Sequence, residues 1–141
     1  MKKIPKTILV VDDEPGTVRM LEKILKLDGY HVIKAFNGTT GFKMAKSELP
    51  FLILLDVLMP DMDGKQVARL LRASPATKNI PIIFLTVTIK LEDDKGDETI
   101  TIDGIEYRAM AKPMHTRKLL SMIRKAVNKR FNENPKKDKD G

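Results

Sequence analysis

Short apolar runs alternate with amphipathic segments along this chain of 141 residues. Three runs contain only apolar residues: 8–11, 51–55 and 82–85. Uninterrupted runs of this length are typical of strands buried on both faces of a parallel sheet. A shorter strand is predicted at 30–33. The intervening segments carry apolar residues at helical spacing. This alternation of strands and helices predicts an α/β fold with a parallel sheet.

The helices begin and end at recognisable signals. The first begins at Pro15 and stops before Asp28-Gly29, and the second follows Asn37-Gly38 and closes before Pro50. The third starts at Asp63-Gly64, and the last covers about residues 116–131. The polar residues 132–141 are expected to be disordered, so the domain is expected to span 1–131.

One segment breaks the alternation. Residues 99–102 are all β-branched and therefore poor helix formers, and Asp103-Gly104 favours a two-residue hairpin turn. The turn sets the register of the two strands: Ile102 opposite Ile105, Thr101 opposite Glu106, Ile100 opposite Tyr107 and Thr99 opposite Arg108. One face of this arrangement is apolar and the other polar. The sequence therefore predicts a β-hairpin near 99–108.

Carboxylates follow two of the buried strands. Asp12 and Asp13 come directly after the first strand, and Asp56 ends the third. The carboxyl ends of parallel strands meet at one edge of an open sheet, where such folds bind ligands. Three carboxylates gathered there would repel one another unless a hard cation neutralised them, and ligands that are all oxygen indicate Mg²⁺.

Two later strands end in residues that are not acidic. Thr86 ends the strand that begins at residue 82, and Lys112 follows a strand predicted at 107–111, just before Pro113. A hydroxyl and an ammonium beside carboxylates and a cation suit an anionic group that comes and goes. A phosphoryl group is the obvious candidate.

These residues resemble the receiver domain of two-component response regulators. The matching positions are Asp12-Asp13, Asp56, Met59-Pro60, Asp63-Gly64, Thr86 and Lys112-Pro113. They occur in the family's order, and the resemblance covers about residues 6–131. It implies a flavodoxin-like, doubly wound sheet of five parallel strands in the order 2-1-3-4-5. In this family a fourth helix usually lies between the positions of Thr86 and Lys112, and the predicted hairpin would replace it.

The resemblance also implies roles. Asp56 would accept a phosphoryl group from a histidine kinase or a histidine phosphotransfer protein. Mg²⁺ would be held by Asp13, Asp56 and the main-chain carbonyl of Leu58, with Asp12 binding directly or through water. Lys112 would pair with Asp56 and then with the phosphoryl group, and Thr86 would report its arrival. The protein would be a signalling switch that catalyses only its own phosphorylation and dephosphorylation.

The sequence departs from the family at its output end. Receiver domains usually carry Tyr or Phe three residues before the lysine, where this chain has Ala109. Tyr107 lies on the same face two residues earlier, and the sequence leaves open whether it substitutes. The alternative function is therefore a protein-interaction module that acts without phosphorylation. Leu58 cannot position water by hydrogen bonding, which predicts slow loss of the phosphoryl group.

The net charge of +7 is concentrated in the last helix, where residues 114–131 include six Lys or Arg and no acid. This pattern is typical of a solvated face or of a docking face, which together with the hairpin would bind a downstream protein. No aromatic residues lie among the basic ones, so direct nucleic-acid binding is not expected. The chain has no cysteine and no apolar run long enough to span a membrane, and a cytoplasmic protein is expected. The kinase, the pathway and the oligomeric state stay open, as does the question of a larger parent protein.

Overall fold

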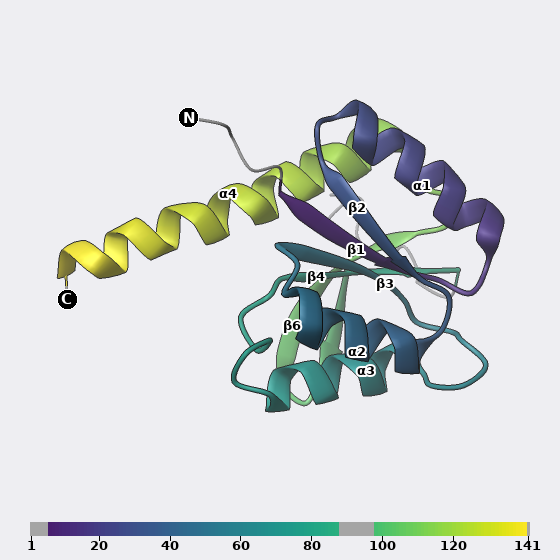
Figure 1. Cartoon of the computed structure of the whole chain (residues 1–141), viewed down its shortest axis with the longest axis horizontal. Helices are drawn as coiled ribbons and strands as arrows, with labels where there is room; N and C mark the ends of the chain where they lie inside the picture. Colours follow the sequence, from purple (N-terminus) through teal and green to yellow (C-terminus); the bar gives the residue numbers. More distant parts are fainter. Residues whose placement is uncertain (1–5, 88–97, 141) are drawn as a thin grey trace.

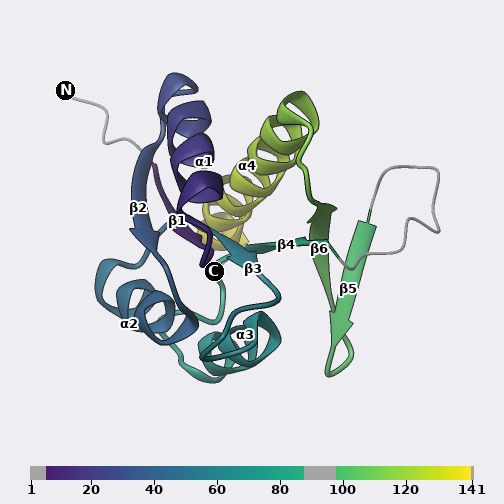
Figure 2. The ribbon, with the colours of Figure 1, turned by 90° about the vertical axis from the view of Figure 1, so that its right-hand side faces the viewer.

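The computed structural model describes residues 6–87 and 98–140, with the backbone alone for residues 98 and 129–140. A six-stranded sheet lies between two layers of helices (Figures 1 and 2). In chain order the elements are β1 (Thr7–Val11), α1 (Pro15–Leu27), β2 (His31–Ala35), α2 (Gly38–Glu48), β3 (Leu52–Asp56), α3 (Gly64–Ala73), β4 (Ile82–Thr86), β5 (Glu98–Ile102), β6 (Ile105–Ala111) and α4 (Thr116–Asp140).

The strands lie in the order β2-β1-β3-β4-β6-β5. The first five in this order pair in parallel, and β5 joins the edge antiparallel to β6. The predicted parallel order 2-1-3-4-5 is therefore confirmed, with β6 in the fifth place. The antiparallel strand at the edge is the extra element that the hairpin adds.

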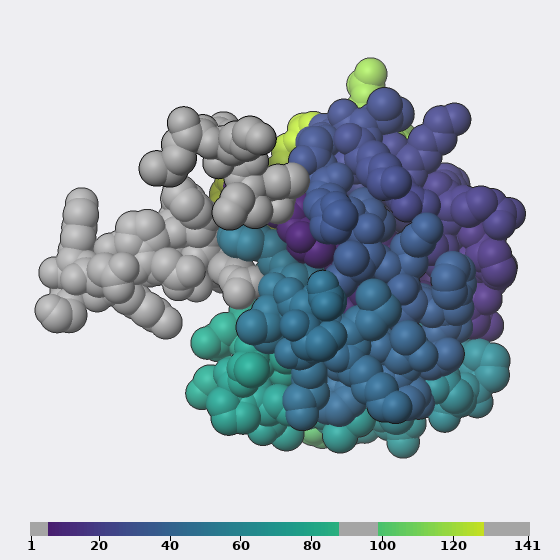
Figure 3. All heavy atoms as spheres, viewed as in Figure 1, coloured from purple at the N-terminus to yellow at the C-terminus, as the bar shows by residue number. Residues whose placement is uncertain are grey.

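Each face of the sheet has its own apolar core. The face with Ile8 and Val10 packs against α1 and α4, and the face with Leu9 and Val11 packs against α2 and α3. Figure 2 shows these helix pairs on opposite sides of the sheet. In the space-filling view the side chains of α1 and α2, in purple and blue, form a close-packed surface (Figure 3). Because both faces are covered, the central strands contain only apolar residues until they reach the edge.

The predicted hairpin is confirmed, including its register. Ile102 pairs with Ile105 and Thr99 with Arg108, as the two-residue turn requires. Asp103 and Gly104 both have positive φ, 53° and 80°, which is the backbone of a type I′ turn. Arg69 of α3 donates to the carboxylate of Asp103 at 3.0 Å, and this contact links the turn to the neighbouring helix.

The last helix differs from the prediction. It begins at Thr116 as expected but continues to Asp140, past the expected end at residue 131. Lys and Glu favour a helix, but this segment also contains Pro135, which is unfavourable in a helix interior, so its composition alone does not explain the continuation. The position of the domain boundary at residue 131 stays a prediction.

Candidate functional site

Four strands deliver the predicted site residues to one edge of the sheet. Asp12 and Asp13 follow β1, Asp56 ends β3, Thr86 ends β4, and Lys112 follows β6. These strands are parallel neighbours, so their carboxyl ends lie together. The main-chain N–H of Lys112 donates to the carbonyl of Thr86 at 3.0 Å, which fixes the last two ends to each other.

The three acids form a compact cluster. Each of Asp12, Asp13 and Asp56 offers a carboxylate oxygen, and these oxygens lie within 4.8 Å of one another. Asp12 is fully buried, Asp56 is 5% exposed, and Asp13 is partly exposed. The Oδ1 atom of Asp12 accepts a hydrogen bond from the main-chain N–H of Glu14 at 3.0 Å. The predicted carboxylates are therefore brought together at the edge of the core.

Lys112 lies among these carboxylates, with its side chain only 10% exposed. Its Nζ atom is 2.6 Å from Asp12 Oδ2, 3.4 Å from Glu14 Oε1 and 3.5 Å from Asp56 Oδ2. The lysine is thus near Asp56, as the sequence suggested, but its shortest contact is with Asp12. The Glu14 contact has hydrogen-bonding geometry, and the 2.6 Å separation from Asp12 is that of a close ion pair.

Burial and charge shift the protonation of the site. Burial, followed by the negative charge of Asp12, raises the pKa of Asp56 to about 6 from 3.8. The Lys112 ammonium and the N–H of Leu58, 3.4 Å from Asp56 Oδ1, oppose this rise. Burial would lower the pKa of Lys112, but its contacts with Asp12, Asp56 and Glu14 prevail, so the pKa is raised. The cluster therefore holds more negative charge than the single lysine neutralises.

The donor set fits a divalent cation. Asp12 Oδ2 is buried and lies 2.6 Å from the Lys112 ammonium, so a metal ion bound to this oxygen would replace the lysine as its partner. A buried carboxylate oxygen needs a positively charged partner, and a metal ion could supply that charge in place of the lysine. All three carboxylates offer oxygen, which is the ligand type that Mg²⁺ prefers.

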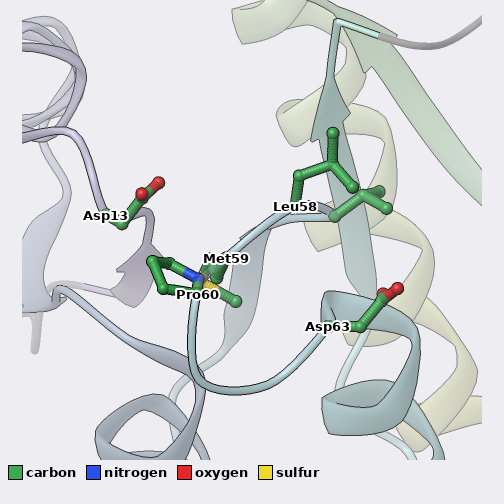
Figure 4. Close-up of a pocket in the computed structure, with 6 residues that line it drawn as sticks. Asp13, Leu58, Met59, Pro60 and Asp63 are labelled. Carbon is green, nitrogen blue, oxygen red and sulfur yellow. The ribbon is translucent and has the colours of Figure 1, made fainter.

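A hollow of about 300 Å³ opens beside the cluster. Its lining comes from Asp13 and from the loop after β3: Val57, Leu58, Met59, Pro60 and Asp63. Figure 4 shows Asp13 and Asp63 on opposite sides of this hollow, with Met59 and Pro60 between them. The side chain of Leu58 is 52% exposed at its rim. Asp13 is the member of the acid cluster that lines this hollow.

The loop between β3 and α3 passes close beneath the site. A Cβ atom on Gly64 would lie 2.2 Å from the carbonyl oxygen of Asp56, so only glycine fits there. Asp63 caps α3: its carboxylate accepts from the N–H of Lys65 at 2.7 Å, and Gln66 bonds back to the Asp63 N–H at 3.2 Å. Asp63 therefore holds the helix rather than a metal.

Sequence reasoning gave no role to two further acids. Asp61 accepts hydrogen bonds from the main-chain N–H groups of Gly38 and Thr39, both at 3.0 Å, and these bonds lower the pKa of Asp61 to about 2. Asp61 thus connects the loop after β3 to the start of α2. The first N–H groups of a helix have no partner within the helix, and this was the one feature of the sequence that could have suggested such a role. Glu14 reaches Lys112, and its only signal was its place directly after Asp13.

The aromatic residue of the hairpin lies away from the cluster. Tyr107 is buried beside Phe84, with ring centroids 5.5 Å apart and planes at 84°. Thr86 pairs with Ala111, four residues further along β6, which is about 13 Å in an extended strand. Tyr107 therefore does not lie beside Thr86, and Ala109, where the family usually has an aromatic residue, pairs with Phe84.

Comparison with known proteins agrees with the fold and the arrangement of the site. The model of the response regulator receiver domain family matches residues 8–124. The chain is 41% identical over 120 residues to the response regulator PleD of Caulobacter vibrioides, covering 83% of this chain and 25% of PleD. It is 34% identical to the protein PilH of Pseudomonas aeruginosa, covering 82% of this chain and 93% of PilH. The chain thus spans about a quarter of PleD and nearly all of PilH.

Solved structures give the same result. A CheY-like response regulator receiver domain protein from Methanospirillum hungatei superposes with a TM-score of 0.78 at 25% identity, covering 92% of this chain and 99% of that one. The receiver domain of the sensor histidine kinase PA1611 from Pseudomonas aeruginosa superposes with a TM-score of 0.76 at 26% identity, covering 89% and 99%. That structure contains a magnesium ion coordinated in its active site cleft.

Within the described ranges 6–87 and 98–140, none of the helices has the length and apolar character needed to cross a membrane. The sequence match, the superpositions and the order of the strands all lead to one family. The chain belongs to the response regulator receiver domains of two-component systems, which are signalling domains.

Proposed function

We propose that this protein is a phosphoacceptor switch that receives a phosphoryl group on Asp56 from a histidine kinase or a histidine phosphotransfer protein. The observation that carries the proposal is the environment of Asp56. Its carboxylate ends a buried strand, clusters with two other acids within 4.8 Å, and lies 3.5 Å from the Lys112 ammonium. Such a nucleophile suits phosphoryl transfer, which depends mainly on positioning and charge.

In this proposal a carboxylate oxygen of Asp56 attacks phosphorus. The bond between phosphorus and the donor nitrogen breaks, and its electron pair leaves with the donor imidazole. A pKa of about 6 leaves Asp56 largely ionised near neutral pH, as attack requires. Mg²⁺ held by Asp12, Asp13, Asp56 and the Leu58 carbonyl would supply positive charge next to the phosphoryl oxygens. Lys112 is close enough to exchange its contact with Asp12 for one with the phosphoryl group.

The structural response to phosphorylation would begin at Thr86. Its hydroxyl can donate to a phosphoryl oxygen after a small movement at the end of β4. The hydrogen bond from Lys112 N–H to the Thr86 carbonyl would carry such a shift to β6 and the hairpin. A downstream protein with acidic residues would then meet the exposed basic side chains of α4, which include Arg117 and Lys125. The phosphoryl group adds roughly −1.5 to −2 charges and changes partner affinity only through a difference between two states.

A second candidate is a protein-interaction module that acts without phosphorylation. The observation that favours it is that Ala109, which is fully buried, stands where the family usually has an aromatic residue, while Tyr107 packs against Phe84. In that case the site would be chemically competent, but the hairpin would not respond to it.

The test is intact mass after incubation with acetyl phosphate, with and without Mg²⁺. We expect one phosphoryl adduct that requires Mg²⁺ and is lost in Asp56→Asn. The matched control is Asp63→Asn, which makes the same change of charge in the same loop but keeps a good helix cap. The control should form the adduct at the rate of the unmodified chain. An adduct that persists in Asp56→Asn, or no adduct from either acetyl phosphate or a phosphorylated histidine donor, would reject the proposal.

A further inference from the structure

In the described residues, the outer edge of the hairpin has no partner strand. β5 is the last strand of the sheet, and no strand in residues 6–87 or 98–140 pairs with its outer side. Its sequence is Glu-Thr-Ile-Thr-Ile, and its register with β6 contains no bulge. Native proteins usually protect such an edge with lysine, proline or a bulge. β5 contains no lysine, proline or bulge, its charged residue Glu98 stands at its first position, and β-branched residues fill the other four positions.

The alternation of bonded and non-bonded residue pairs in the hairpin identifies which backbone groups of β5 point outward. A two-residue turn is closed by a hydrogen-bonded pair, here Ile102 and Ile105. Antiparallel pairs alternate between bonded and non-bonded, so Ile100 is bonded to Tyr107. Thr99 and Thr101 lie in the non-bonded pairs. Their N–H and C=O groups therefore point outward, away from β6.

This pattern is self-complementary. A two-fold axis at Ile100 places Thr99 of one copy opposite Thr101 of the other, so each outward N–H meets an outward C=O. Two such threonine pairs would give four backbone hydrogen bonds. Ile100 would face the same residue of the second copy as a non-bonded pair, with Cα atoms about 4.5 Å apart. The half-buried side chain of Ile100, which already packs against the core beside α3, would lose its remaining exposure.

The neighbouring charges permit this register. Glu106 lies beside Thr101, and Arg108 beside Thr99. After the two-fold rotation, Thr101 of one copy lies opposite Thr99 of the other. Each row of residues across the four strands therefore has Glu106 of one copy at one end and Arg108 of the other copy at the opposite end. In the described side chains no like charges face each other across the new strand pair. A pair of five-residue strands buries less than the roughly 1,600 Å² of a stable interface, so the association is weak and depends on concentration.

We propose that two copies of this chain associate edge to edge through β5, antiparallel and centred on Ile100, to form one continuous sheet. This association is independent of the chemistry at Asp56, which lies at the carboxyl edge of β3. The net charge of +7 on each copy opposes association. Because salt screens this repulsion, the dimer is favoured at higher ionic strength.

The chain contains no cysteine, so single cysteines report the register directly. In Ile100→Cys the two sulfurs face each other across the axis, within the range of a disulfide. In the matched control Thr99→Cys, the two Cα atoms lie about 8 Å apart, which is too far. Under mild oxidation we expect Ile100→Cys to form covalent dimers at least about tenfold faster than Thr99→Cys. Thermal unfolding confirms that both variants are folded.

A second variant removes an outward donor. Proline at position 99 loses an N–H that does not bond to β6, so Thr99→Pro leaves the hairpin ladder complete. Combined with Ile100→Cys, it should reduce dimer formation to the rate of Thr99→Cys, whereas Thr99→Val in the same background should not. Equal cross-linking of the two single cysteines would overturn the proposal. So would a wild-type chain that sediments as a monomer at millimolar concentration in high salt.

Discussion

Gly64→Ala tests whether the loop beneath Asp56 determines both stability and chemistry. The added Cβ would lie 2.2 Å from the Asp56 carbonyl oxygen and 3.0 Å from Val57 Cα. Both neighbours are backbone atoms, so no side-chain rotation relieves the overlap. An ordinary contact begins at 3.4 Å, and the loop must therefore move by roughly 1 Å.

The cost follows from this movement. Overpacking against rigid neighbours costs about 2–3 kcal/mol of unfolding free energy, which corresponds to a fall in Tm of roughly 5–10 °C. The hydrogen bond from Gly64 N–H to the Val57 carbonyl, 2.8 Å long, is strained by the same shift. Because the displaced carbonyl belongs to Asp56, its carboxylate moves too. A misplacement near 1 Å reduces the rate of phosphoryl gain by about 100-fold.

The assay compares Gly64→Ala with Gly16→Ala. Gly16 lies in the first turn of α1, and nothing lies within 4 Å of an added Cβ atom there. The control should be stabilised by about 0.4–1 kcal/mol, because alanine restricts the unfolded chain. Urea unfolding gives the two free energies, and intact mass after timed exposure to acetyl phosphate gives the two rates. If Gly64→Ala matched the control in both measurements, the steric reasoning would be refuted.

Three further predictions concern the charges and the rim of the site. In metal-free protein the raised pKa of Asp56, about 6 against 3.8, means that the stability from this group is complete below about pH 4 and lost as pH rises through 6. Asp56→Asn should therefore raise Tm increasingly between pH 4 and 7 in EDTA, and a difference that does not vary with pH would contradict this. Lys112→Met removes a cation that lies 2.6 Å from Asp12, and it should strengthen Mg²⁺ binding on the order of tenfold. Asp13→Asn removes a carboxylate and should weaken Mg²⁺ binding. Calorimetry measures both affinities, and unchanged affinity in both variants would show that the metal binds elsewhere. Leu58→Asn places an amide that can hold water beside the phosphoryl group and should speed its loss by about tenfold in a timed mass assay; equal lifetimes would remove Leu58 from the explanation.

Much of the site could be predicted from the sequence because its residues follow buried strands. The apolar runs that end at Asp12, Asp56 and Thr86 fix both the strand and its exit, and parallel pairing brings the exits together. The hairpin was equally predictable, since Asp103-Gly104 fixes the register of a two-residue turn. At these positions the local sequence pattern is enough to predict the structure that the folded chain adopts.

Other features depend on contacts between distant segments. The preference of Lys112 for Asp12 over Asp56 depends on distances of 2.6 and 3.5 Å that no local pattern encodes. Asp61 looked like one more acid in a loop, because its partners at the start of α2 lie more than 20 residues away. The continuation of α4 to Asp140 has no signal in the sequence, because residues 132–140 are polar and lack an apolar stripe that would bury one face of a helix.

The hydrogen bond between Lys112 N–H and the Thr86 carbonyl has an evolutionary consequence. It holds the two ends of the intervening segment 3.0 Å apart, inside the ladder of β4 and β6. Because the ends are anchored there, exchanging the segment for another of different length alters mainly the entropy of loop closure, which grows slowly with length. A hairpin can thus replace a helix between Thr86 and Lys112 without moving either residue. Chimaeras that exchange the segment between these two residues should have the surface of the protein that donates the segment and the site chemistry of the protein that receives it.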